Sequence, residues 1–212
     1  MYSNESFVIK EQQSKELIFT TLETLLIQSN WHKDLIRESE AKNFFPKYYS
    51  EFLFPGGIKS VVLEFDKWQS DKTLKILSKS DFPEKIRDKI TLALNTRIIK
   101  VMDKQILLRQ FAFFSVFYNF DIAMKAIIYN VDLLWRYADD KSTDFNFYTK
   151  RFLLALIYIL ASNFYQADNS ENARDTEVFI KYLVDNIANL QKIKKHLTHS
   201  IIVKIPILRL FL

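Results

Sequence analysis

The side chains best suited to chemistry or recognition are concentrated in one short segment, DDKSTDFNFYTKR, at residues 139–151. The segment combines acids, hydroxyls, aromatics and a basic pair, and it directly precedes the apolar run FLLALIYILA. Thr143 or Asp144 can accept hydrogen bonds from the first free amides of a helix. Phe147 and Arg151 are four residues apart, so they share a helix face. Aromatic and arginine side chains are enriched in protein interfaces, which makes this face a candidate recognition surface.

A structural role for the same segment is the alternative. Phe147 would then pack inward, and Arg151 would pair with Asp140 or Asp144. Asp139 and Asp140 follow the preceding helix, where acids interact unfavourably with the helix dipole. The presence of two acids at this unfavourable position suggests that the segment has a role besides ending the helix.

Several classes of catalytic site are excluded by composition. The only two glycines, Gly56 and Gly57, cannot build a Gly-rich nucleotide loop or a nucleophile elbow. Cysteine is absent, which removes thiolate metal sites and thiol nucleophiles. Three histidines without a Glu three residues before them do not form the Glu-x-x-His signature of di-iron bundles. We therefore expect neither an enzyme, nor a metal site, nor a cofactor.

The N-terminal residues are polar and acidic and show no secretory or organellar signal. The longest apolar runs are shorter than the roughly 18 residues needed to span a membrane. The amino-acid composition is rich in Lys, Asn and Ile and poor in Gly. From these features we expect a bacterial cytoplasmic protein, peripheral to the inner membrane.

The net charge of +5 is local. The last 22 residues carry five basic residues and no acid, and the other 25 basic residues balance the 25 acidic ones. The tail is apolar as well as basic, which suits an anionic membrane surface. The alternative is a tail packed on its own core. The membrane-binding candidates are Lys192, Lys194, Lys195, Lys204 and Arg209.

The chain has few helix-breaking residues, and its apolar residues recur at helical spacing. The sequence therefore predicts an all-α protein. We expect a helix over 14–28, with Ser14 as its N-cap. Two shorter helices should follow, the second of which ends at the glycine pair. Further helices are expected over 60–77, 82–102, 105–117, 120–138 and 145–166, and from about 175. Pro83 would lie in the first turn of the helix over 82–102.

Three short helices at the N-terminus invite a helix-turn-helix interpretation. Residues 1–58 carry six basic and eight acidic residues. Because DNA binding depends on neutralising phosphates, this balance weighs against it. The central helices from 105 to 166 are apolar on most faces. Such helices form a dense core, line a cavity or meet another subunit.

LLWRYADDKSTDFNFYTKRFLLALIY and the later TEVFIKYLVDNIANLQKI resemble the ninth coenzyme Q biosynthesis protein of mitochondria and its alphaproteobacterial relatives. FLFPGGIKSVV near residue 58 is similar to a second marker of that family. The likeness extends over about residues 14 to 196 in consistent order.

This resemblance implies a fold like that of TetR regulators, with a vestigial helix-turn-helix and a helical lipid-binding domain that is usually dimeric. It implies a protein that is not catalytic, that binds isoprenoid-like lipid at membranes, and that supports the di-iron demethoxyubiquinone hydroxylase. By matching positions, the partner-binding surface would comprise Trp135, Asp140, Thr143, Asp144, Asn146, Phe147, Tyr148 and Arg151.

Two positions depart from the family pattern. Phe147 stands where the family has Trp, which removes an indole donor and contact area. Asp139 stands where the family has Gly, and it adopts a left-handed conformation less readily.

The sequence thus predicts a helix-turn-helix segment over 1–58, a lipid-binding domain over 59–196 and a tail over 197–212. The function predicted is presentation of a polyprenylated quinone intermediate by a homodimer that does not bind nucleic acid. The alternative is a TetR-type repressor with an apolar effector, in which Lys47 would contact DNA. Helix phase gives the lipid-binding candidates Phe111, Phe114, Ile127, Leu134, Leu154, Ile157 and Tyr158.

Overall fold

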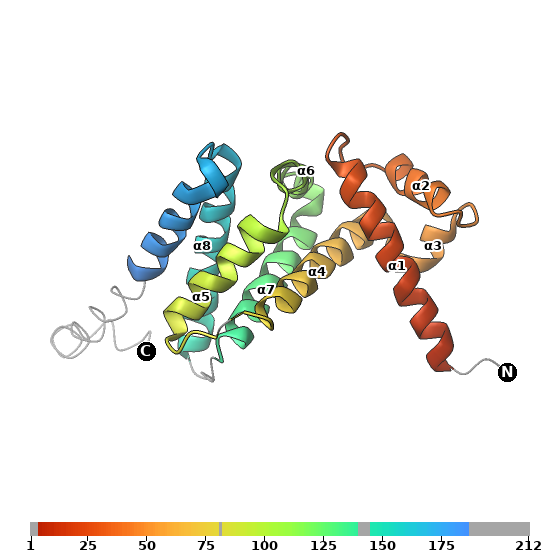
Figure 1. Ribbon diagram of the computed structural model, residues 1–212. Helices are drawn as coiled ribbons and strands as arrows, with labels where there is room; N and C mark the ends of the chain where they lie inside the picture. Colours follow the sequence, from red (N-terminus) through yellow and green to blue (C-terminus); the bar gives the residue numbers. More distant parts are fainter. Residues whose placement is uncertain (1–3, 81, 140–144, 187–212) are drawn as a thin grey trace, which may run out of the picture.

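The structure of the protein is a computed structural model that describes residues 4–80, 82–139 and 145–186 (Figure 1). Within these ranges the regular structure is entirely helical, as the sequence predicts. A TetR-like arrangement and the division into three parts stay predictions.

The N-terminal third forms a small helical bundle around an aromatic core. Its helices are α1 (Asn4–Leu26), α2 (Lys33–Lys42) and α3 (Tyr49–Leu53). Phe19 of α1 contacts the rings of Phe54, Phe65 and Trp68, and Trp31 packs edge-on against Phe65. The expectation that Ser14 caps α1 is wrong, because the helix begins earlier and the Ser14 hydroxyl donates to the Lys10 carbonyl within it.

Helix α4 (Gly57–Leu77) connects the two hydrophobic cores of the protein. Its first half contributes Val61, Val62 and Phe65 to the N-terminal core, and Leu77 at its end belongs to the second core. Gly57 has a φ of 63°, a conformation that side chains with a Cβ rarely adopt, so the glycine pair starts this helix with a sharp turn.

The second core is built from the remaining helices. Next along the chain are α5 (Ile86–Asn95), the π-helical turn η1 (Thr96–Val101) and α6 (Lys104–Phe114). Then follow the 3-10 turn η2 (Phe117–Asn119), α7 (Phe120–Tyr137), α8 (Phe145–Ala167), the 3-10 turn η3 (Glu171–Ala173) and a helix over residues 174–186.

The predicted helix over 82–102 is therefore shorter and broken. It begins at Ile86, so Pro83 is not in its first turn, and it changes to π geometry at Thr96. Ile90, Leu94 and Ile98, at spacings of four within this segment, are buried.

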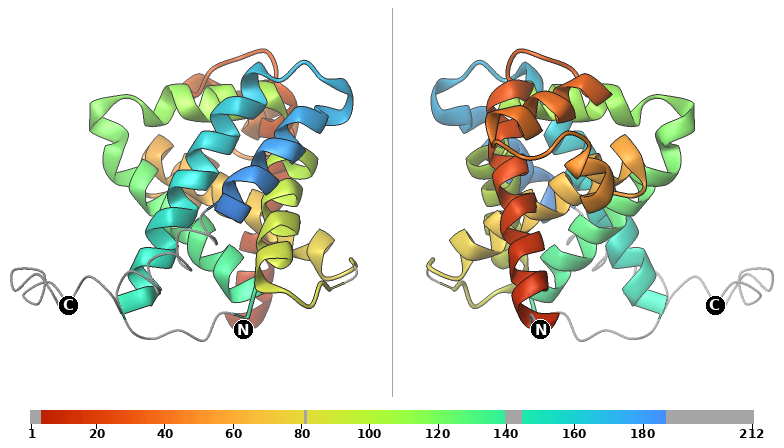
Figure 2. Two further views of the ribbon diagram at one scale, coloured as in Figure 1. Left: turned by 90° about the vertical axis from the view of Figure 1, so that its left-hand side faces the viewer. Right: turned by 90° about the vertical axis from the view of Figure 1, so that its right-hand side faces the viewer.

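Residues 105–117 are not buried on all sides, although their sequence is apolar on most faces. Leu108 and Phe117 are largely exposed, because this stretch runs along the outside and ends at a corner (Figure 2).

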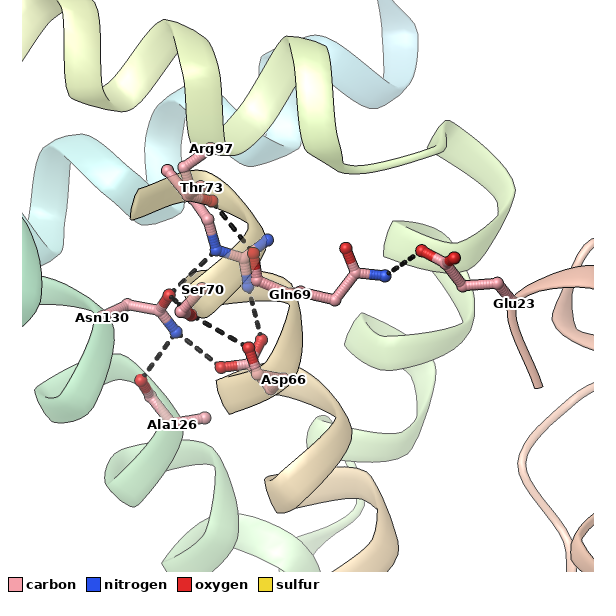
Figure 3. Close-up of polar contacts among 8 residues, drawn as sticks. All are labelled: Glu23, Asp66, Gln69, Ser70, Thr73, Arg97, Ala126 and Asn130. Atoms are coloured by element: carbon pink, nitrogen blue, oxygen red, sulfur yellow. Dashed lines mark hydrogen bonds and ion pairs between the residues drawn. The ribbon is translucent and has the colours of Figure 1, made fainter. Parts of the chain in front are cut away.

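A buried polar network holds the middle of α4 to η1 and α7 (Figure 3). Arg97 is fully buried and donates to Asp66 through Nη2 at 2.7 Å and to the Asn130 side-chain oxygen through Nε at 2.9 Å. The Asn130 amide donates in turn to the second oxygen of Asp66, and Ser70 donates to Asn130. Three helical elements thus meet at one charge pair, whose hydrogen bonds link the members of the network to one another.

Asp168 caps the start of the helix over residues 174–186. Its carboxylate accepts hydrogen bonds from the Ser170 amide at 2.7 Å, and from the amide and hydroxyl of Thr176 at 2.9 and 2.5 Å. Burial by itself raises the pKa of Asp168, but the hydrogen bonds from Ser170 and Thr176 outweigh that effect and hold the pKa well below its usual range. The charged form is therefore the one that the fold stabilises.

We expect Asp168→Ala to lower the free energy of unfolding at neutral pH by about 1–2 kcal/mol. Because the pKa is lowered in the folded state, this stabilisation is complete above the unfolded value near 3.8 and is lost as the pH falls below it. Urea unfolding of both proteins should therefore show a difference at neutral pH that shrinks at about pH 2. A difference that does not change with pH would contradict the charged cap.

Candidate functional site

An apolar groove lies between α4, α7 and α8. It has a volume of about 660 Å³. Helix α4 contributes Leu63 and Lys67 to its wall, and α7 and α8 supply the rest. These are Met124, Lys125, Ile127, Ile128, Tyr129, Val131, Asp132, Phe147, Tyr148, Arg151, Phe152 and Ala155.

The wall is apolar because of the spacing of residues on the two long helices. Met124 and Ile128 are four residues apart on α7, as are Tyr148 and Phe152 on α8, so each pair lies on one side of its helix. Ile128, Tyr148 and Phe152 are all exposed. Apolar side chains are thus left open to solvent on facing helices, which favours an apolar occupant.

One end of the groove is fixed by Arg151. Its Nε and Nη2 donate to Asp132 Oδ1 at 3.1 and 2.9 Å. The guanidinium also lies 3.3 Å from the centre of the Phe147 ring, within the range of a cation–π contact. Asp132 pairs with Arg136 as well. Asp132 thereby positions Arg151, and Arg151 positions Phe147.

Lysines provide positive charge at the groove. Lys67 lies over the Tyr129 ring at 5.3 Å, and Lys125 is 3.9 Å from Asp121. The groove therefore combines an apolar wall with cationic side chains, an arrangement that suits an apolar molecule with a polar head.

Most of this groove falls in a segment that is similar to known proteins. Residues 120–191 match the family model named COQ9. This segment of the chain is similar to the COQ9 family. All the lining residues except Leu63 and Lys67 belong to this segment.

Curated relatives agree with that match. The human protein named "Ubiquinone biosynthesis protein COQ9, mitochondrial" is 36% identical over 73 residues, which cover 34% of this chain and 23% of the human protein. The bovine protein of that name is 33% identical over 82 residues, covering 39% and 26%. The rat protein is 40% identical over 60 residues, covering 28% and 19%. The matched segment thus spans about a quarter or less of the length of these relatives.

The expectation of a bacterial cytoplasmic protein is wrong by this comparison, because these relatives are named as mitochondrial. It relied in part on amino-acid usage. Usage reflects the base composition of a genome, not the compartment in which a protein works.

The segment that matches the COQ9 model brings several of the predicted partner-binding residues together. Phe147, Tyr148 and Arg151 line the groove, and Trp135 lies half-buried on α7 with Lys150 over its ring at 5.6 Å. Asp140, Thr143, Asp144 and the side chain of Asn146 lie outside the described residues. The expected sharing of one face by Phe147 and Arg151 is confirmed by their contact.

Sequence reasoning missed Asp132, which contacts Arg151 from the preceding helix. A single acid within the mostly apolar stretch AIIYNVDLLW was the available signal. Any additional pairing of Arg151 with Asp140 or Asp144 falls outside the described residues.

The predicted lipid-binding residues occupy three different environments. Leu134, Leu154, Ile157 and Tyr158 are buried in the second core. Phe111 packs against that core and Phe114 against the N-terminal one. Ile127 alone among the seven lines the groove. Lipid contact by the other six stays a prediction, and for the four buried residues it requires the core to open.

The predicted membrane-binding residues Lys192, Lys194, Lys195, Lys204 and Arg209 lie outside the described residues. Within the described part of the chain, no single helix is long and apolar enough to cross a bilayer. The pair Lys104–Phe114 and Phe117–Tyr137, bent by 101°, passes that test only when taken together.

Asp139, the residue at the family's glycine position, has a φ of 60°. Its amide donates to the Arg136 carbonyl at 3.1 Å, so it ends α7 in the left-handed conformation that glycine adopts without strain.

We expect Asp139→Gly to raise the free energy of unfolding by about 1 kcal/mol, because it removes the strain of a Cβ at positive φ. Asp139→Ala retains the Cβ and should not stabilise. Thermal unfolding of the two variants provides the comparison, and equal midpoints would show that φ is not the cause.

Proposed function

We propose that the chain works in ubiquinone biosynthesis as a lipid-binding protein without catalytic activity of its own. The groove would hold the prenyl tail of a quinone intermediate and present it to the di-iron demethoxyubiquinone hydroxylase at a membrane surface. The observation that carries this proposal is that the apolar groove is formed mostly by the segment that is similar to the COQ9 family.

The size and lining of the groove support the lipid. A volume of 660 Å³ lies within the range of about 300–1,000 Å³ of small-molecule sites. Burial of an isoprene unit removes on the order of 100 Å² of apolar surface from water, worth about 2.5 kcal/mol. A few units against Met124, Ile128 and Phe152 would therefore supply ample affinity.

The partner surface would be the outer side of the same groove. Phe147 and Arg151 are held in place by Asp132, and Tyr148 beside them is exposed. A preorganised aromatic–arginine pair costs little entropy on binding, which suits a docking site for the hydroxylase.

A homodimer is part of the proposal. Beyond the groove, α8 exposes Leu156, Leu160 and Phe164 at spacings of four, and Val178 and Tyr182 are exposed on the helix over 174–186. Phe164 stacks on Phe179 at 4.5 Å, so the two helices form one apolar face. Leu160→Arg should convert a dimer to a monomer in light scattering. A wild-type protein that is monomeric at high concentration would contradict the proposed homodimer.

The direct test is mass spectrometry of the organic extract of the full chain purified from a ubiquinone-making host. We expect isoprenoid quinones or their precursors in near-stoichiometric amount. A protein that is empty after purification, and that takes up none of these lipids from vesicles, would overturn the lipid role.

A further inference from the structure

The corner between α6 and α7 exposes an unusual run of apolar side chains. Phe117 is 86% exposed and Tyr118 is 81% exposed, and Val116 and Phe120 beside them are also exposed. Both views of Figure 2 show this corner jutting from the helical body, where α6 turns into α7. Convex aromatic surface of this kind has no complementary wall within the described chain.

Several backbone groups of the corner are already paired. The Asn119 amide donates to the Val116 carbonyl at 2.8 Å, and its buried side chain donates to the Phe113 carbonyl at 2.9 Å. Lys59 of α4 donates to the Tyr118 carbonyl. The corner can therefore enter an apolar medium without stranding these polar groups, which is the condition that a bilayer imposes on a backbone.

Basic side chains flank the aromatics. Lys59 and Lys125 lie on either side of Asp121, at 3.2 and 3.9 Å. Two cations against one anion leave the rim of the corner positive. Aromatic tips with a basic rim are typical of an interfacial membrane contact, where rings enter the headgroup region and lysines meet anionic lipid.

The apolar surface continues from the corner into the groove. Phe120, Met124 and Ile128 follow at spacings of four along one face of α7, and all three are exposed. Met124 and Ile128 line the groove itself.

We propose that the α6–α7 corner is a membrane-insertion site that places Phe117 and Tyr118 in the interface of an anionic bilayer, next to the groove mouth. The occupant is a lipid surface, because the corner is convex, braced and rimmed by lysine. The idea that this corner passes an apolar ligand from the bilayer to the groove rests on the proposed function. The membrane contact itself does not depend on the proposed function.

The absence of native cysteine allows a clean test. The full chain with Phe117→Cys carries a nitrobenzoxadiazole probe, and the control carries the probe at Phe44→Cys, a site that is 95% exposed on the N-terminal bundle. Vesicles are phosphatidylcholine with about one-fifth cardiolipin. We expect a blue shift and brighter emission at 117 on adding vesicles, and no change at 44. A 117 probe that stays water-like while the protein co-sediments would assign binding to another segment and overturn the inference.

A second measurement removes the aromatics. Phe117→Ser with Tyr118→Ser should weaken co-sedimentation about tenfold or more, and Phe44→Ser should leave it unchanged. Equal binding of the wild type and both variants would overturn the inference. A probe at 117 whose emission changes with protein concentration in the absence of vesicles would also overturn it, because that result assigns the corner to a contact with a second copy. Failure of the proposed function appears separately, as an empty lipid extract from a protein whose corner still inserts.

Discussion

Replacing Arg97 with methionine is expected to lower the free energy of unfolding by about 3–5 kcal/mol. Arg97 is the only cation that the described residues place on Asp66, and both side chains are buried. The variant would leave a carboxylate inside the protein without its cation, although the Asn130 amide would still donate to one of its oxygens. Burial already raises the pKa of Asp66 against the opposing effect of Arg97, so without Arg97 the carboxyl should take up a proton more readily still.

Urea unfolding of the single variant and of a double variant tests the cause. Asp66→Leu combined with Arg97→Met removes both charges and should recover much of the loss, because a buried ion pair is often replaceable by apolar side chains of similar size. Arg37→Met is the matched control, since Arg37 pairs with Asp34 at the exposed surface. It should cost at most about 1 kcal/mol. An Arg97→Met variant as stable as this control would contradict the buried pair.

Filling the groove is expected to abolish most lipid binding without unfolding the protein. Ala155 lines the groove from α8 and is half-buried. Ala155→Trp would place an indole where an apolar chain would lie, so we expect about tenfold less isoprenoid lipid in the purified protein. Quantitative mass spectrometry of the extract measures the change.

A matched tryptophan separates blocking from damage. Ala41 is exposed on α2, far along the chain from the groove. Ala41→Trp should purify with as much lipid as the wild type. Full lipid content in Ala155→Trp, with an unchanged unfolding midpoint, would place the lipid elsewhere and restore the core residues Leu154 and Ile157 as candidates.

The helices could be predicted from sequence because their signals are local. Apolar spacing of three and four located α4, α7 and α8 to within a few residues. The start of α1 and the break at Thr96 could not be predicted this way. Polar residues such as Ser14 occur inside helices as well as at their starts, and the π turn at Thr96 has no local sequence signal.

The groove was only partly predictable, for a related reason. The pairing of Phe147 with Arg151 follows from spacing on one helix. Asp132 lies on a different helix, 19 residues earlier, and only the packing of α7 against α8 brings it to Arg151. Helix phase also assigned Leu154 and Ile157 to a lipid pocket, because an apolar row gives no sign of whether a neighbouring helix covers it.

The network around Asp66 also constrains the order of assembly during synthesis. Asp66 leaves the ribosome 31 residues before Arg97 and 64 before Asn130. Until both have emerged, burying this carboxylate would be costly, so the middle of α4 should remain hydrated. The residues of α4 up to Phe65 carry no such restriction, and Phe65 can close on Phe19 and Trp31 at once. The nascent chain should therefore fold in two stages, with Asn130 completing the second.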